Sequence, residues 1–172
     1  MHGMGEGIVI AWPGTTTVSY KGITKGKAVR LTAEDVLLVK EKVPDILRIS
    51  PEYIRSRRIR YNKEEYNNNI RGVNVEYQYM RNTIPQKGRF IDDLDVKNRR
   101  RVCFLGNTIA QNLFKDEDPL EKKVYVEGVP FVVVGVMVKK IQNSNYSGQR
   151  DEHCLFIPYT TFSTLYGQKY VS

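Results

Sequence analysis

The sequence predicts an α+β fold built on mixed sheets. Apolar runs of strand length alternate with short amphipathic segments of helical pattern, which is typical of that class. Residues 87–136 place a strand, a short helix and a hairpin in close succession, with Gly or Pro at nearly every joint. A chain of 172 residues can bury a substantial core, in one domain or in two small lobes that share a boundary.

The first 50 residues predict two strands around one well-marked helix. Residues 6–12 favour an opening strand, and a polar loop over 15–27 follows. Thr32 and Asp35 have the spacing of a helix-initiating capping box, and Pro44 ends the helix. A second strand is expected over 46–50. The helix should bury one apolar face, formed by Val36, Leu37, Val39 and Val43.

The middle of the chain predicts an arginine-rich strand and its neighbours. Residues 53–61, YIRSRRIRY, have the composition of a strand, but neither face is fully apolar, so we expect it to be partly exposed. An Asn- and Glu-rich turn follows, then a strand over 69–73. Residues 74–82 fit one or two turns of helix.

The last 72 residues repeat this mixed pattern. Residues 101–106 predict a buried strand, and 108–115 a helix capped by Asn107 or Thr108. The remaining expected elements are a hairpin of 123–126 and 131–138 across 127–130, a polar flexible loop at 148–152, a strand at 154–157, and a helix at 160–166 ended by Gly167.

Five positions are expected to have structural roles at the joints of these elements. Gly106 would turn a strand into a helix, Gly128 would close a hairpin, and Gly135 would thin a buried strand. Gly88 would open the segment that begins near residue 86, and Pro119 lies in a loop.

The net charge of +8 and the isoelectric point near 9.4 allow three kinds of partner. Nucleic acid is one, although no aromatic residues are interleaved with Lys and Arg as in RNA-binding signatures. An acidic protein or anionic lipid headgroups would fit the same charge. The basic run Arg99-Arg100-Arg101 is either a solvated strand entry or a docking site, and we take Arg99 and Arg100 as candidates for docking a partner.

The residues provide no constellation for catalysis, so we expect no enzyme activity, no cofactor and no metal. Gly22–Ala28 differs from a phosphate-binding loop in its spacing and lacks the required Ser or Thr. His153 and Cys154 are adjacent, so their side chains should point to opposite faces of a strand. The acids Asp92, Asp93 and Asp95 could bind a metal, but their pattern better fits a helix N-terminus.

The remaining signals concern the compartment. Cys103 and Cys154 lie inside apolar runs and are expected to be buried as small hydrophobic residues, with a disulfide as the alternative. The longest apolar run, 131–138, is too short to span a bilayer, so we expect this piece to be soluble. Residues 145–147 match a glycosylation sequon, a pattern that is frequent by chance.

Five blocks in the same order resemble the periplasmic core domain of MacB-type ABC transporter permeases. The resemblance covers nearly the whole chain, and the ordered set is specific although each block alone is weak. The blocks are LTAEDVLLVKEKVPDILRISPEY (31–53), IRGVNVEYQYMRN (70–82), GRFIDDLDVKNRRRVCFLG (88–106), LFKDEDPLEKKVYVEGVPFVVVGVM (113–137) and CLFIPYTTFSTLYG (154–167).

The resemblance implies a two-lobed domain on the periplasmic side of the inner membrane. A porter-like lobe would begin in residues 1–85, a smaller inserted lobe would occupy 86–158, and 159–172 would return to the first lobe, which the chain would leave truncated at its C-terminal end. The domain would be non-catalytic and would couple cytoplasmic ATP hydrolysis to efflux, lipoprotein release or signalling. Its partners would be the transmembrane and ATPase domains, a second copy in a homodimer, and a periplasmic adaptor protein.

Overall fold

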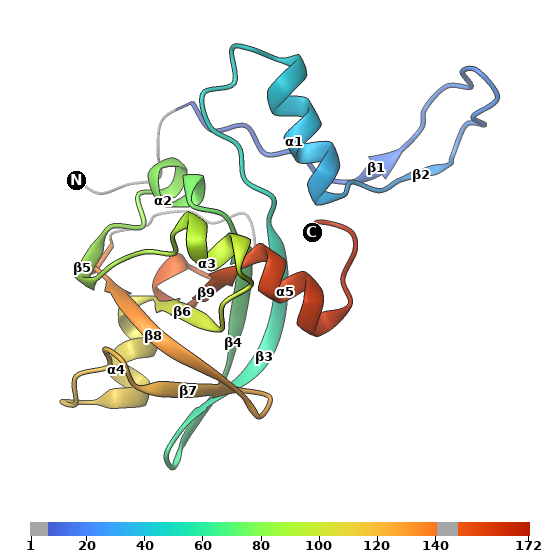
Figure 1. The fold of residues 1–172 in the computed structure, drawn as a ribbon. Coiled ribbons are helices and arrows are strands. Elements are labelled where there is room, and N and C mark those ends of the chain that lie inside the picture. Colours follow the sequence, from blue (N-terminus) through green and yellow to red (C-terminus); the bar gives the residue numbers. More distant parts are fainter. Residues whose placement is uncertain (1–6, 141–147) are drawn as a thin grey trace.

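A mixed sheet of seven strands forms the body of the molecule (Figure 1). The computed structural model describes residues 7–140 and 148–172. The strands follow the order β5-β8-β6-β9-β4-β3-β7, and β8 also pairs with β7, so the sheet closes on itself. Two pairs, β4 with β9 and β6 with β8, are parallel, and the others are antiparallel. The strands are β3 (Tyr53–Tyr61), β4 (Glu64–Val73), β5 (Pro85–Gly88), β6 (Val102–Leu105), β7 (Lys123–Val126), β8 (Val129–Met137) and β9 (Leu155–Pro158).

Short helices lie around this sheet, which confirms the predicted α+β class with mixed sheets. They are α1 (Ala33–Lys42), α2 (Glu76–Arg81), α3 (Asp93–Lys97), α4 (Asn107–Phe114) and α5 (Tyr159–Tyr166), together with the 3₁₀ turn η1 (Asp151–His153). The last helix ends at Gly167, whose φ of 58° lies in the left-handed region, as predicted from the sequence.

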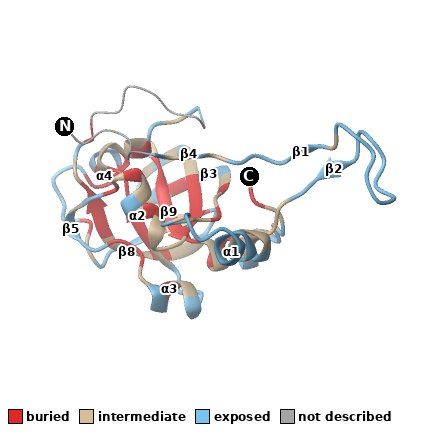
Figure 2. Ribbon diagram, turned by 90° about the horizontal axis from the view of Figure 1, so that it is seen from above, coloured by how far each residue is buried: buried red, intermediate tan, exposed pale blue. Residues whose placement is uncertain are grey.

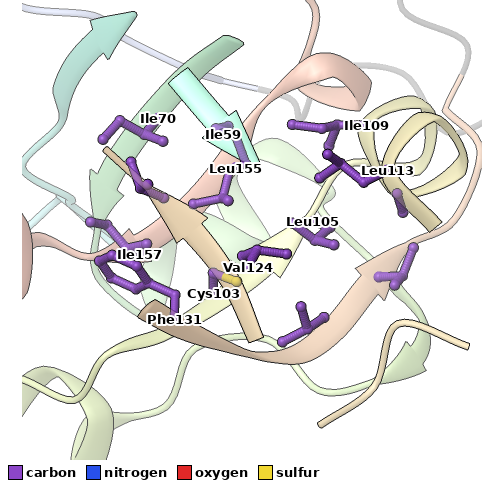
Figure 3. Packing of buried hydrophobic residues seen from close by; sticks show 14 of the residues in the cluster. Ile59, Ile70, Cys103, Leu105, Ile109, Leu113, Val124, Phe131, Leu155 and Ile157 are labelled. Atoms are coloured by element: carbon purple, nitrogen blue, oxygen red, sulfur yellow. The ribbon is translucent and has the colours of Figure 1, made fainter. Parts of the chain in front are cut away.

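The apolar residues of the closed sheet and α4 form one continuous core. Figure 3 shows side chains from β3, β4, β6, β9 and α4 meeting in the interior, where Ile59, Leu105 and Leu155 are fully buried. A second, smaller core lies under α2 and α3, and it includes Phe90, Phe104 and Phe156. Figure 2 shows that the buried residues are concentrated in the sheet, whereas α1 and the two N-terminal strands are mostly exposed.

Both hairpins of the sheet have shorter turns than the sequence suggested. Strand β3 has the predicted bounds, but β4 begins at Glu64, five residues earlier than expected, so the turn is only Asn62 and Lys63. In the β7–β8 hairpin, Glu127 and Gly128 both have positive φ, at 47° and 85°. A two-residue turn with this geometry matches the right-handed twist of the strands. Backbone pairing with β3 extends β4 into residues whose polar side chains do not predict a strand.

The prediction of a side-chain cap on α4 was wrong. The N-cap is Gly106, and neither Asn107 nor Thr108 caps the helix. A Cβ atom at Gly106 would collide with the backbone of Asp151 and Glu152 in η1. Since this approach excludes any side chain, the helix begins at a residue that cannot supply a cap.

Three predictions for the N-terminal part were wrong. Neither residues 7–12, the described part of the strand predicted over 6–12, nor residues 46–50 form a strand. Instead, β1 (Gly14–Thr15) pairs with β2 (Ala28–Val29) in the N-terminal part of the chain. The capping box of Thr32 and Asp35 is present and α1 ends before Pro44, as predicted, but α1 buries no residue. Among the described residues, 7–12 and 46–50 have no neighbouring strand to pair with. Of the expected apolar face of α1, only Val36 packs, partly buried, against the core. The exposed apolar residues of α1 and its C-cap are Leu37, Leu38, Val39 and Val43.

The chain segments of the predicted lobes meet within one sheet. Strands β3 and β4, from residues 1–85, pair with β7 and β9, from residues 86–158. The division into 1–85, 86–158 and 159–172 therefore stays a prediction. Segments 1–85 and 86–158 contact each other through the β3–β7 and β4–β9 strand pairs. The sequon at 145–147 lies outside the described residues.

The five joint residues lie at close approaches or turns. Gly88 pairs with Gly135 where β5 meets β8, and the φ of Gly88 is 67°. A Cβ atom on Gly135 would collide with the backbone of Arg89. Pro119 precedes β7, and its carbonyl accepts a hydrogen bond from the Lys122 N–H, at 3.2 Å.

We expect Gly135→Ala to destabilise the fold by about 2–3 kcal/mol, because the added methyl group forces the β5 backbone away from β8. Urea unfolding would measure the change in free energy. Gly14→Ala is the matched control, since a Cβ there meets nothing within 4 Å and its cost should stay within about 0.5 kcal/mol. Equal costs for the two variants would contradict this account of the β5–β8 contact.

Candidate functional site

The acidic cluster of residues 92–95 forms the N-terminus of α3, as its pattern predicted. The Asp95 N–H donates to Asp92 Oδ1 at 2.8 Å, and the Asp92 N–H donates to Asp95 Oδ2 at 3.1 Å, so the two acids form a capping box. Among the described residues, no group of three His, Cys, Asp or Glu side chains could hold a metal ion.

Two arginines bind the buried carboxylate of Asp95. Arg89 Nη1 donates to Asp95 Oδ2 at 2.6 Å, and Arg100 Nη1 donates to Oδ1 at 3.5 Å. Burial acts to raise the pKa of Asp95, but the hydrogen bonds from Arg89 and from the Asp92 backbone lower it below the ordinary value. Arg100, one of the two docking candidates, is therefore partly engaged in holding α3.

The other docking candidate, Arg99, lies in a different environment. Its backbone is left-handed, with φ of 50°, and its side chain is exposed. Arg99 lines a groove of about 470 Å³ between α1 and α5. The structure thus separates two neighbouring residues that the sequence grouped into one docking site.

The α1–α5 groove combines apolar, hydroxyl and cationic groups. Leu37 of α1 forms part of one wall, and Lys169 lies beyond the end of α5. The hydroxyls of α5 already support the structure: Ser163 Oγ donates to the Gln168 carbonyl and Thr164 Oγ1 to the Thr160 carbonyl, both at 2.8 Å. The groove, which Glu34 of α1 also lines, can receive a partner. Sequence reasoning missed it because its walls are more than 100 residues apart.

A cluster of buried charged side chains lies around η1, and the sequence did not predict it. Asp151 in η1 is fully buried, and three cations surround it. Arg71 Nη1 lies 3.0 Å from Oδ1, while Arg81 Nη2 and Lys140 Nζ lie 3.2 Å and 2.9 Å from Oδ2. We call Asp151, Arg71, Arg81 and Lys140 the charged centre. Its members come from η1, β4, α2 and the segment after β8, respectively.

The prediction of a flexible loop at 148–152 was therefore wrong. The Gln149 carbonyl accepts a hydrogen bond from Arg71 Nη2 at 3.0 Å, and Gln149 Oε1 accepts one from the Asn69 N–H at 2.7 Å. Polar residues predict a solvated loop unless their partners are known, and Arg71, 80 residues away, is the partner of Asp151. The one available signal was an arginine between the buried residues Ile70 and Val73.

The charges of this centre depend on one another. Burial acts to raise the pKa of Asp151, but Arg71, Arg81 and Lys140 together lower it below the ordinary value. Burial lowers the pKa of Lys140, and the Asp151 carboxylate acts against that shift. Arg71 also lies 3.3 Å from Glu52, and the Tyr77 hydroxyl, which donates to Glu52 Oε1 at 2.9 Å, extends the network.

Both cysteines are free and buried, as the sequence analysis preferred over a disulfide. Burial raises the pKa of the Cys103 thiol, and it raises that of Cys154 to about 12, so neither is a ready nucleophile. The side chain of His153 is 38% exposed whereas Cys154 is fully buried, but neither residue lies in a strand as expected: His153 ends η1 and Cys154 precedes β9. In the part of the chain that the structure describes, no helix is both long and apolar enough to cross a bilayer.

Comparison with known proteins agrees with the resemblance in the sequence. The model of the MacB-like periplasmic core domain family matches residues 2–172. The chain belongs to this family. It is 26% identical over 171 residues to the macrolide export ATP-binding/permease protein MacB of Bdellovibrio bacteriovorus, covering 99% of this chain and 26% of that relative. The corresponding protein of Hyphomonas neptunium is 30% identical, over 98% of this chain and 26% of its own length.

Solved structures show the same fold. The extracellular domain of the noncanonic ABC-type transporter YknZ from Gram-positive bacteria superposes with a TM-score of 0.71 at 24% identity, covering 83% of this chain and 70% of that one. The periplasmic region of MacB from Actinobacillus actinomycetemcomitans gives a TM-score of 0.72 at 20% identity, covering 84% and 63%.

The MacB-like core domain thus corresponds to the periplasmic domain of an ABC transporter permease, and it spans about a quarter of the length of the two MacB relatives. The net charge of +8 had suggested a nucleic-acid partner, but the family is one of periplasmic transporter domains, so nucleic-acid binding is not favoured.

In the MacB-like core domain, we expect Asp151→Asn to cost about 3–5 kcal/mol of stability, because three buried cations lose their shared carboxylate. Chemical denaturation would measure the loss. Asp118→Asn is the control: its exposed carboxylate pairs with the half-exposed Lys87 and accepts a hydrogen bond from the Leu120 N–H, and its removal should cost no more than about 1 kcal/mol. Similar costs at both positions would refute the role of the charged centre.

The same carboxylate should make stability depend on pH. The folded-state pKa of Asp151 is lowered, so it stabilises the fold above the ordinary Asp value of 3.8, and this stabilisation is lost as the pH falls through the folded value. The free energy of unfolding should therefore fall more steeply below about pH 5 in the wild type than in Asp151→Asn. Asp95 also has a lowered pKa, so some slope remains in the variant. Parallel curves, measured from denaturation midpoints between about pH 3 and 7, would count against the shift.

Proposed function

We propose that the chain is a non-catalytic coupling domain of an ABC transporter permease. It passes conformational change between cytoplasmic ATP hydrolysis and a partner docked outside the membrane. The observation that carries this proposal is the match of the MacB-like periplasmic core domain family to residues 2–172. Because the chain spans only about a quarter of its MacB relatives, the ATPase and transmembrane parts are the partners it requires.

The closed sheet and the charged centre support a mechanical role. A domain that transmits movement must keep its own shape while it moves as a unit. The charged centre joins β4, α2, η1 and the end of β8 through buried ion pairs of 2.9–3.2 Å. Removing Asp151 would leave Arg81 and Lys140 buried without the carboxylate that they share, so these segments separate only at high cost.

The proposed output is efflux, lipoprotein release or signalling. Efflux has the support of the relatives' names, which describe macrolide export. We also propose a homodimeric transporter, and docking of a periplasmic adaptor protein at the α1–α5 groove through Arg99, with Arg100 beside it. The division into segments 1–85, 86–158 and 159–172 belongs to the same proposal.

Movement of this domain in response to nucleotide tests the proposal. We expect a spin label on Lys97→Cys in the full-length transporter to report a different distance between the two subunits in the nucleotide-free and ATP-trapped states, measured by electron–electron resonance. Lys97 is exposed at the end of α3. The native cysteines should stay unlabelled, because both are buried and their pKa values are raised.

A transporter whose ATP-binding domain cannot bind nucleotide is the control, and its distance should not change. If the active transporter also gave one unchanged distance distribution, the domain would not respond to ATP and the coupling function would be rejected.

A further inference from the structure

A strongly basic hairpin projects from the body of the molecule. It comprises residues 14–30, which include β1, β2 and Arg30, and Figure 1 shows it extending away from the sheet beside α1. Apart from Thr16, every residue of the hairpin is exposed. We call residues 14–30 the basic hairpin.

The basic hairpin is held together by its own hydrogen bonds. At its base, the Thr16 N–H donates to the Lys27 carbonyl at 3.0 Å and the Gly26 N–H donates to the Thr16 carbonyl at 2.8 Å. At its tip, Tyr20 and Ile23 exchange backbone hydrogen bonds of 3.0 and 2.9 Å around a turn in which Lys21 and Gly22 have φ of 44° and 82°. A preformed element loses less conformational entropy on binding than a loop that must become ordered.

Positive charge is concentrated here without any negative charge. The hairpin contains Lys21, Lys25, Lys27 and Arg30, and residues 7–33 include no Asp or Glu. None of the ion pairs among the described residues involves these four cations. The guanidinium of Arg30 lies 5.1 Å from the ring of Tyr170, so the last of them is fixed to the body of the domain. The hairpin thus carries four of the eight net positive charges of the chain, and three of them lie beyond the contact of Arg30 with the body.

Apolar side chains accompany the cations toward the tip. Val18 is 71% and Tyr20 65% exposed, and Ile23 is exposed to a lesser degree. Tyrosine is enriched in protein–protein interfaces, where its ring supplies contact area and its hydroxyl a polar bond. The combination fits a recognition surface better than a solvated loop.

We propose that the basic hairpin docks on an acidic surface of a periplasmic protein partner. The inference rests on the proposed coupling function, in which such a partner docks, and it names a surface separate from Arg99 and Arg100. A protein partner is favoured over a lipid surface because the cations are spread from the tip to the base, whereas a membrane would be met first by the tip. An acidic protein face along the hairpin can pair with all four and would be attracted at long range.

Photo-crosslinking in the full-length protein, in its own cells, tests the inference. With a photoreactive residue in place of the exposed Val18, we expect crosslinks to a protein segment rich in Asp and Glu, located by mass spectrometry. Lys25→Glu with Lys27→Glu should reduce the yield about tenfold, since repulsion replaces attraction. Replacing acids of the crosslinked segment by Lys should restore it. The neutral pair Lys25→Gln with Lys27→Gln should give an intermediate yield.

Lys63→Glu with Lys123→Glu is the matched control, because both lysines are exposed and the net charge changes equally. Its yield should remain within about twofold of the wild type. Three outcomes would overturn the inference. They are crosslinks only to phospholipid, a crosslinked protein segment without Asp or Glu, and a crosslinking yield that Lys25→Glu with Lys27→Glu leaves unchanged.

The nucleotide-dependent distance at position 97 separates this inference from the proposed function. A distance that responds to ATP without any hairpin crosslink rejects the hairpin and leaves the coupling function. Acid-dependent crosslinks with a distance that ignores ATP support the hairpin and reject the coupling.

Discussion

The pairing of one buried carboxylate, Asp151, with three cations sets the arrangement of the fold around it. Arg71 and Arg81 lie 80 and 70 residues before it in the chain, and Lys140 lies 11 residues before it. Because an unpaired buried charge is costly, the segments that carry these residues can be buried only together. The η1 turn that carries Asp151 directly precedes β9, which joins β4 to β6 in the sheet. The ion pairs therefore fix the place at which β9 enters the sheet.

Glycines allow the backbone approaches that this arrangement requires. The joint between β6 and α4 contacts η1 through Gly106, whose N–H donates to the Cys154 carbonyl at 2.9 Å and which has no side chain to keep the turn away. On the opposite side of β6, β8 pairs with three neighbours, and Gly135 lets Arg89 approach it closely. Charge pairing and close backbone contact thus act on adjoining parts of one closed sheet.

The sequence predicted features whose cause is local and missed those whose cause is distant. The capping box at Thr32 and the helix N-terminus at residues 92–95 both depend on residues within three positions of each other, and both are present. The β3 strand and the end of α5 at Gly167 were predicted for the same reason. By contrast, the burial of Asp151 depends on Arg71, 80 residues earlier, and the α1–α5 groove on residues more than 100 positions apart. Leu37 is exposed for a similar reason: the sequence pattern shows that α1 has an apolar face, but it does not show which residues pack against that face.

The domain places its positive charge in two environments with different consequences. In the charged centre, cations are desolvated and paired, so they contribute to a fixed shape and are not available to a partner. In the basic hairpin, cations are solvated and without ion pairs, so changing them alters association more than stability. The proposed coupling needs both a rigid domain and a contact with the partner. Force passes only through a domain that keeps its shape and that is bound to the partner it moves. Half of the net charge of +8 thus lies in the exposed hairpin, outside the packed body of the fold.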